Sequence, residues 1–139
     1  ICESVEKITM YDLDEFKLRG TEIHNTIAKC AAQASKDLPI KAIVASTLTG
    51  KTALDIASLR PDALIVATTT TKEVARSLAL KWGVYTKLVP IGNDTDSISQ
   101  DGVLAAKELL DLQKGDLVIV VGGSPKEAHT NFLKIEEIK

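Results

Sequence analysis

Strand-like runs alternate with segments of helical periodicity along most of the chain, and this alternation limits the possible folds more than any other feature. Four runs have the length and composition of strands: residues 41–46, 63–68, 84–89 and 117–121. Between them, apolar residues recur every three or four positions, as on one face of a helix. Such alternation predicts right-handed crossover units and a parallel sheet covered by helices on both faces. The sequence therefore predicts an α/β fold.

Four helices are expected around these strands, at residues 21–38, 50–59, 70–81 and 97–112. Pro39 ends the first, because proline cannot continue a helix. Thr70 with Glu73 predicts a capping box at the start of the third helix, and Ser97 with Gln100 predicts one at the start of the fourth.

The last strand is expected to differ from the others. Residues 132–138 alternate apolar and polar side chains, which is typical of an edge strand with one wet face. About ten residues separate this strand from the fourth run. Because a helical crossover needs a dozen or more residues, we expect the last strand to be antiparallel.

Length and composition favour a single soluble domain. The chain has 139 residues, of which 45% are hydrophobic and only 4% aromatic, so the expected core is aliphatic and disorder is excluded. A net charge of -2 argues against nucleic acid and anionic membranes as partners, and no apolar run could span a bilayer.

The chain lacks an initiator Met, which suggests that it is a piece of a longer protein. We expect residues 1–20 to form a connecting segment with a helix at 1–7. Residues 21–139 are expected to form the domain.

The turn after the first strand is the strongest candidate for a binding site. It lies where a parallel strand ends and a helix begins, the usual ligand position in open α/β sheets. Free N–H groups and the positive end of the helix dipole favour an anion there, aided by glycine, hydroxyls and a lysine. The alternative is that Thr47 or Thr49 only caps the helix. A P-loop is excluded, because Ala45 stands where its first glycine is required. The residues predicted to bind the anion are Thr47, Leu48, Thr49, Gly50, Lys51 and Thr52.

A second candidate turn follows the fourth strand. Gly123 and Ser124 could also contact an anion, and this turn would adjoin the first one if strands one and four are neighbours. The alternative is an ordinary turn.

No catalytic or metal site is expected within the chain. The histidines (His24 and His129) and the cysteines (Cys2 and Cys30) have no partners at catalytic or metal-ligand spacing, and reduced thiols fit a cytoplasmic location. Asp94, Asp96 and Asp101 lack the ligand pattern of a calcium loop and are better explained by helix capping. We therefore predict no catalytic residues, no bound metal and no cofactor in this domain.

Several short motifs together resemble the C-terminal domain of pyruvate kinase. The resemblance covers residues 21–139 and lies in the order and spacing of the motifs. They are Lys41-Ala42-Ile43-Val44, the turn at 47–52, Arg60-Pro61, Gly83-Val84-Tyr85, Lys114-Gly115-Asp116 and Thr130-Asn131.

The resemblance implies both a fold and a role. It implies a three-layer α/β/α sandwich whose five strands have the order 3-2-1-4-5, with the last antiparallel. It also implies a regulatory domain that binds a phosphorylated effector at residues 47–52 and contacts other subunits of a homo-oligomer. The parent enzyme of glycolysis would transfer phosphoryl from phosphoenolpyruvate to ADP, with magnesium and potassium held in a separate catalytic barrel domain. The chain alone is not expected to catalyse this reaction.

The chain also departs from the family pattern. Members that bind fructose 1,6-bisphosphate carry a Trp and an Arg after the third strand, and residues 91–96 contain neither. The loop at 123–129 also lacks the family's glycine-rich stretch. A sugar monophosphate or nucleotide monophosphate is therefore an equally good candidate. Two other hypotheses remain: a domain that only assembles subunits, and a stand-alone small-molecule binding protein with the same fold.

Overall fold

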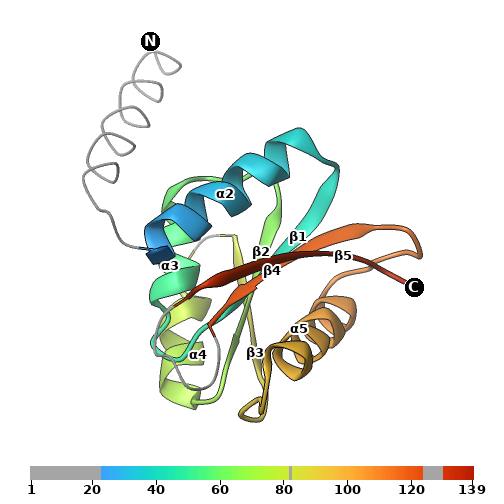
Figure 1. Ribbon diagram of the computed structural model, residues 1–139. Coiled ribbons are helices and arrows are strands. Elements are labelled where there is room, and N and C mark those ends of the chain that lie inside the picture. Colours follow the sequence, from blue (N-terminus) through green and yellow to red (C-terminus); the bar gives the residue numbers. More distant parts are fainter. Residues whose placement is uncertain (1–22, 82, 124–129) are drawn as a thin grey trace.

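A computed structural model describes residues 23–81, 83–123 and 130–139 of the chain (Figure 1). Residues 1–20, predicted to be a connecting segment, and the helix predicted at 1–7 lie outside the described residues. So do Cys2, Ser124 and His129.

Four helices and five strands make up the described residues. In chain order they are α2 (Ile23–Asp37), β1 (Ile40–Ser46), α3 (Lys51–Ser58), β2 (Leu64–Thr69), α4 (Lys72–Ala79), β3 (Val84–Leu88), α5 (Thr95–Leu109), β4 (Leu117–Gly122) and β5 (Phe132–Glu137). All five strands match the predicted runs to within one residue at each end. Within the described residues, the helix ends differ from the predictions by up to three residues.

The strands form one sheet in the order β3-β2-β1-β4-β5. β1 is central and pairs in parallel with both β2 and β4, and β2 pairs in parallel with β3. β5 pairs antiparallel with β4 and forms one edge. The predicted α/β class, strand order and antiparallel last strand are confirmed.

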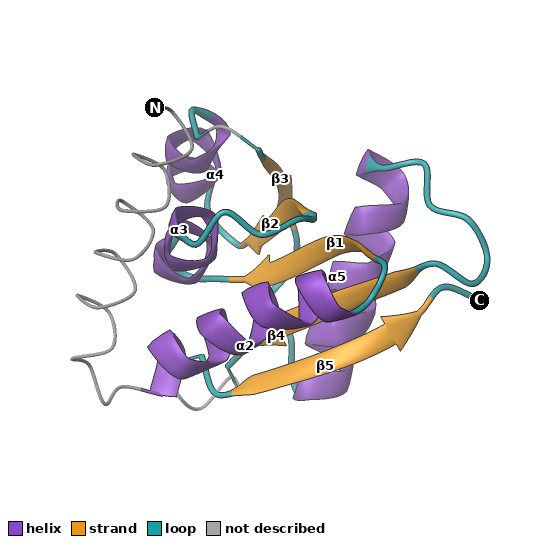
Figure 2. Cartoon of the chain, turned by 90° about the horizontal axis from the view of Figure 1, so that it is seen from above, coloured by secondary structure: helices purple, strands orange, loops and turns teal. Residues whose placement is uncertain are grey.

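Helices cover both faces of the sheet, which makes three layers (Figure 2). On one face α2, α3 and α4 pack over alternate residues of the central strands, with Ile43, Ile56 and Leu78 fully buried. On the other face α5 packs Ala105 and Ala106 over Val44, Val66 and Val120. The buried hydrophobic residues described are all Ala, Ile, Leu or Val, so the core is aliphatic as predicted.

Gly102 brings α5 close to the central strand. A Cβ atom at this position would lie 2.7 Å from Cγ1 of Val44, closer than real side chains approach. The absence of a side chain lets the helix backbone rest almost directly on β1. This close contact holds α5 in place and with it the N-terminal end of the helix.

The capping-box predictions for α4 and α5 are wrong. The N-cap of α4 is Thr71 rather than Thr70, because β2 extends through Thr69, and it makes no side-chain capping bond within the described residues. The N-cap of α5 is Asp94: its Oδ1 accepts from the Ser97 N–H at 2.7 Å, and the Ser97 hydroxyl accepts from the Asp94 N–H at 3.2 Å. Asp94 and Ser97 together form the capping box, and the positive end of the helix dipole favours the charge of the Asp94 carboxylate.

β5 is an edge strand, but it does not have the single wet face that its pattern predicted. Ile135 is 45% exposed, whereas Phe132 and Leu133, on opposite faces, are both half-buried.

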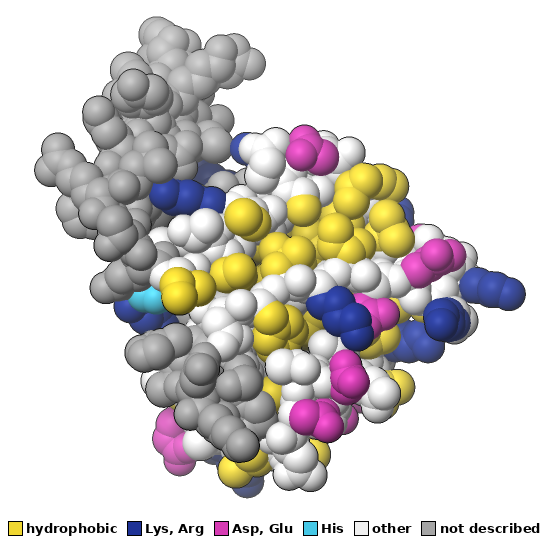
Figure 3. All heavy atoms as spheres, in the orientation of Figure 1, with side chains coloured by type: hydrophobic (Ala, Val, Ile, Leu, Met, Phe, Trp, Pro, Cys, Tyr) yellow, Lys and Arg dark blue, Asp and Glu magenta, His cyan; other side chains and the backbone are white. Residues whose placement is uncertain are grey.

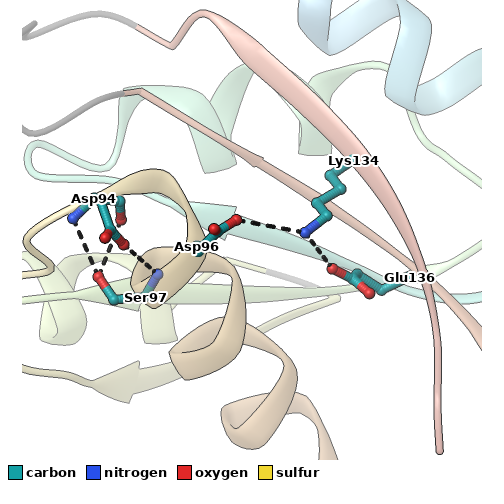
Figure 4. A network of polar contacts seen from close by, with 5 residues as sticks. All are labelled: Asp94, Asp96, Ser97, Lys134 and Glu136. Atoms are coloured by element: carbon teal, nitrogen blue, oxygen red, sulfur yellow. Dashed lines mark hydrogen bonds and ion pairs between the residues drawn. The ribbon is translucent and has the colours of Figure 1, made fainter.

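The side chain of Lys134 on β5 forms two ion pairs, with Asp96 in the first turn of α5 at 3.8 Å and with Glu136 at 2.8 Å (Figure 4). The hydrogen bond and charge of Glu136 raise the pKa of Lys134. Such exposed ion pairs contribute little to stability.

Candidate functional site

Hydrogen bonds of Thr47 and Thr49 stabilise the turn between β1 and α3. The Thr47 N–H donates to the Thr68 carbonyl at 2.9 Å, which ties the turn to β2. The buried Thr47 hydroxyl accepts from the Gly50 N–H at 2.8 Å, and the Thr49 hydroxyl lies 3.4 Å from the Lys51 nitrogen. The threonines therefore bond to residues 50 and 51. The N–H groups of Thr52 and Ala53 belong to the first turn and have no carbonyl partner inside the helix.

Gly50 makes this tight entry into α3 possible. It is the N-cap residue, with φ of 90° and ψ of -9°, in the left-handed region that favours glycine. Its Cα faces α4, since a Cβ atom there would lie 3.3 Å from Cδ2 of Leu78 and 3.4 Å from Cγ1 of Val74. Having no side chain, Gly50 provides no acceptor for the helix N-terminus.

The charge at this helix start suits an anion. Lys51 is the first residue of α3 and is exposed, and the first turn of the helix contains no acidic residue. The helix dipole places partial positive charge at the same point. Leu48 and Thr49 are exposed beside it, so the N-terminus of α3 opens to solvent.

The second predicted turn lies next to the first, because β1 and β4 are neighbours and pair Ala45 with Val121. Gly123 directly follows β4 and is half-buried. The Thr52 hydroxyl in α3 and the Thr130 hydroxyl before β5 are hydrogen-bonded at 2.5 Å, joining residues 78 positions apart. Ser124, the other predicted residue of this turn, lies outside the described residues.

One buried hydroxyl close to this turn lacks a partner. Thr69, at the end of β2, is 1% exposed, and its Oγ1 has no hydrogen bond within the described residues. Residues 43, 45, 65 and 67 alternate onto the face covered by α3, which places Thr47 and Thr69 on that same face. The carboxyl ends of β1 and β2 therefore bring several hydroxyls towards the start of α3.

The remaining chemistry-bearing residues do not form a site. The part of the chain that the structure describes has no group of three His, Cys, Asp or Glu side chains placed to hold a metal ion, and Cys30 is exposed and not in a disulfide. A surface depression of about 180 Å³ lies between β3 and α5, and Lys87 and Glu108 at its rim form an ion pair at 2.7 Å. None of the predicted site residues lines it. None of the helices in residues 23–81, 83–123 and 130–139 is long and apolar enough to cross a membrane.

Comparison with known proteins identifies the family of the chain. Residues 25–136 match the family described as pyruvate kinase, alpha/beta domain. Pyruvate kinase of Clostridium acetobutylicum is 35% identical over 144 residues, which takes in 100% of this chain and 30% of that protein. Pyruvate kinase of Geobacillus stearothermophilus is 39% identical over 120 residues, covering 85% of this chain and 20% of that protein.

A solved structure shows the same fold. The crystal structure of a pyruvate kinase from Cryptosporidium parvum superposes with a TM-score of 0.73 and 33% sequence identity, covering 86% of this chain and 23% of that one. The chain thus spans 20% to 30% of the length of these relatives. The family match covers most of the described residues, including both candidate turns. This chain belongs to the pyruvate kinase alpha/beta domain family.

Proposed function

We propose that this domain is the regulatory part of a pyruvate kinase and binds a phosphorylated effector at the turn between β1 and α3. The parent enzyme would transfer phosphoryl from phosphoenolpyruvate to ADP in glycolysis. The magnesium and potassium ions of that reaction would bind in its catalytic domain. The present domain would contribute binding energy and subunit contacts, not reacting groups.

The open, positively charged start of α3 is the observation that carries this proposal. Anions bind helix N-termini because unpaired N–H groups and the helix dipole act together. Here Gly50 has no side chain to cap the N–H groups of Thr52 and Ala53, Lys51 adds a full charge, and the Thr52 hydroxyl lies in the same turn of the helix. A phosphate dianion can accept all of these bonds at once.

The segment after β3, where bisphosphate-binding members of the family carry a Trp and an Arg, favours a ligand with one phosphate. The segment after β3 carries Ile91, which is 76% exposed, followed by small and acidic residues up to Asp96. An exposed aliphatic side chain and carboxylates offer little to a second phosphate. We therefore favour a sugar monophosphate or a nucleoside monophosphate over a bisphosphate.

A titration with a matched control tests the proposal. The chain is titrated calorimetrically with inorganic phosphate, glucose 6-phosphate, ribose 5-phosphate, adenosine monophosphate and fructose 1,6-bisphosphate. Because a charge-assisted hydrogen bond contributes about 1.5–3 kcal/mol, Lys51→Ala should weaken binding of the best ligand by roughly tenfold to a hundredfold. Lys72→Ala is the control, since Lys72 opens α4 as Lys51 opens α3. If the unmodified chain binds none of these compounds at millimolar concentration, the effector site is refuted.

Subunit assembly is a second candidate function, and the free edge of β5 favours it. Beyond β5 the sheet has no further strand among the described residues, so one row of backbone groups is open to another chain. Figure 3 shows apolar side chains gathered on the face formed by α2 and β5. Ile135 of β5 and Ile23, the first residue of α2, are both exposed.

Charge complementarity supports a second copy of the chain as the occupant of this edge. If two β5 strands pair antiparallel about Ile135, Lys134 of each copy lies opposite Glu136 of the other. The ion pair already present within each strand then extends across the interface. Ile135→Lys should shift the chain towards monomer in sedimentation analysis, whereas Lys107→Ala on α5 should not. A wild-type chain that is monomeric at high concentration would exclude this mode of assembly.

A further inference from the structure

Thr130 is buried at the junction between the candidate phosphate turn and β5. The residue is 6% exposed, and its hydroxyl lies 2.5 Å from the Thr52 hydroxyl in the first turn of α3. The next residue, Asn131, donates its N–H to the Gly122 carbonyl at 2.9 Å, and β5 begins with Phe132. The side chain of Thr130 therefore reaches α3 while its backbone leads directly into the edge strand.

The direction of this hydroxyl bond matters for an anion. Each threonine hydroxyl has one hydrogen to donate and can accept two bonds, and either atom of this pair could be the donor. If Thr52 donates to Thr130, its only hydrogen is used and its oxygen repels a phosphate. If Thr130 donates to Thr52, the Thr52 hydrogen is free to point at the anion. A bound phosphate therefore selects the second arrangement.

We propose that Thr130 is a positioning residue for the effector phosphate: it donates to Thr52 so that Thr52 can donate to the ligand. The hydrogen-bond chain runs from Thr130 through Thr52 to a phosphate oxygen, and each bond strengthens the next by polarisation. This inference rests on the proposed effector site.

A double-mutant cycle tests the chain of bonds. The variants are Thr130→Val, Thr52→Val and their combination, with Thr130→Ser as the conservative variant and the half-buried Thr86→Val in β3 as the control. Binding of inorganic phosphate and glucose 6-phosphate is measured by calorimetry, with melting temperatures in parallel. Because a neutral hydrogen bond contributes about 0.5–1.5 kcal/mol, Thr130→Val should weaken binding about twofold to tenfold. Thr130→Ser should bind within about twofold of the unmodified chain, and the double variant should be no weaker than Thr52→Val. If Thr130→Val does not fold, Thr130→Ala replaces it.

The outcomes separate this inference from the proposed function. A melting temperature lowered by Thr130→Val with unchanged phosphate binding would mean a purely structural role and would overturn the inference. Additive effects of Thr52→Val and Thr130→Val would overturn it as well. In both cases the effector site survives if Lys51→Ala still weakens binding. Failure of the unmodified chain to bind either ligand overturns the site and the inference together.

Discussion

The N-termini of α3 and α5 lie at the same edge of the sheet, but only that of α5 is capped by an acidic side chain. Both helices follow a parallel strand, β1 and β3 respectively, so both direct their positive ends to the carboxyl edge. At α5 the chain supplies its own anion: the Asp94 carboxylate accepts from the Ser97 N–H. At α3 the corresponding residue is Gly50, which has no side chain, and a lysine follows it.

This difference shows where the fold keeps its capacity for a ligand. A helix start already filled by a carboxylate repels a further anion, whereas an open one attracts it. α4 is intermediate, since its N-cap Thr71 makes no side-chain capping bond in the described structure, but Glu73 occupies its first turn. Among these three helices, α3 alone combines an N-cap residue without a side chain, a basic first residue and a first turn without acids. The contrast separates the candidate site from its neighbours without reference to any relative.

Reversing the charge at the start of α3 should break the contrast most strongly. Lys51→Glu gives α3 an acidic first turn like those of its neighbours, so phosphate binding should fall by more than about a hundredfold, which corresponds to about 2.7 kcal/mol. The melting temperature should rise slightly, because an acidic residue near a helix N-terminus is stabilising. Calorimetric titration and thermal melts measure the two effects.

The opposite signs of these effects are the informative part. Lys72→Glu at the start of α4 serves as the control: it should give a similar small rise in stability and leave phosphate binding unchanged. If Lys51→Glu lowered stability and binding together, loss of the fold would explain both and the charge argument would fail.

Adding a side chain at Gly50 should have the next largest effect. Gly50→Ala forces an L-residue into a left-handed conformation, which costs about 1–2 kcal/mol, and places Cβ 3.3 Å from Leu78. Unfolding in urea should show this loss of stability, and phosphate binding should weaken because the turn shifts.

Gly115→Ala provides a matched control for this substitution. Gly115 has φ of 93°, and a Cβ atom there would meet nothing within 4 Å. It should therefore cost a similar conformational strain and leave phosphate binding intact. Equal phosphate affinity in the two variants would contradict a role for Gly50 in the site.

The fold could be predicted from the sequence because its signals are local and repeated. Each strand run is short and bounded by breakers such as Pro39, Pro61 and Pro90, so the strand ends were predicted to within one residue. Helix starts were less predictable, because several polar residues compete for each cap. At α5, Asp94 and Ser97 form the capping box together, and the S/T-x-x-E/Q pattern includes neither an aspartate at its first position nor a serine at its last.

The candidate site was only half visible in the sequence. The turn at residues 47–52 is contiguous, so its glycine, lysine and threonines could be recognised together. The bond between Thr52 and Thr130 joins residues 78 positions apart and depends on β1 and β4 being neighbours. A usable signal did exist: Thr130 directly precedes the strand that returns along β4, at the end where β1 also finishes. The irregular burial of β5 could not be predicted from its sequence. It arises because neighbouring elements only partly cover each face of this edge strand.

The smallest predicted effect concerns the filled helix start and depends on pH. The backbone N–H of Ser97, followed by its hydroxyl, lowers the pKa of Asp94 below its ordinary value. A carboxyl whose pKa is lower in the folded than in the unfolded chain stabilises the fold when it is ionised. Its contribution to stability is complete above the unfolded pKa, about 3.9, and is lost as the pH falls through the folded pKa.

Asp94→Asn should therefore melt a few degrees lower than the unmodified chain at pH 7, and the difference in melting temperature should shrink between about pH 5 and pH 3. Asp62→Asn, an exposed carboxylate outside the helices, should show no such convergence. Phosphate binding should be the same in all three proteins, because Asp94 serves α5 and the proposed ligand serves α3. A weakened phosphate affinity in Asp94→Asn would mean that the two helix starts form one site and would remove the distinction between them.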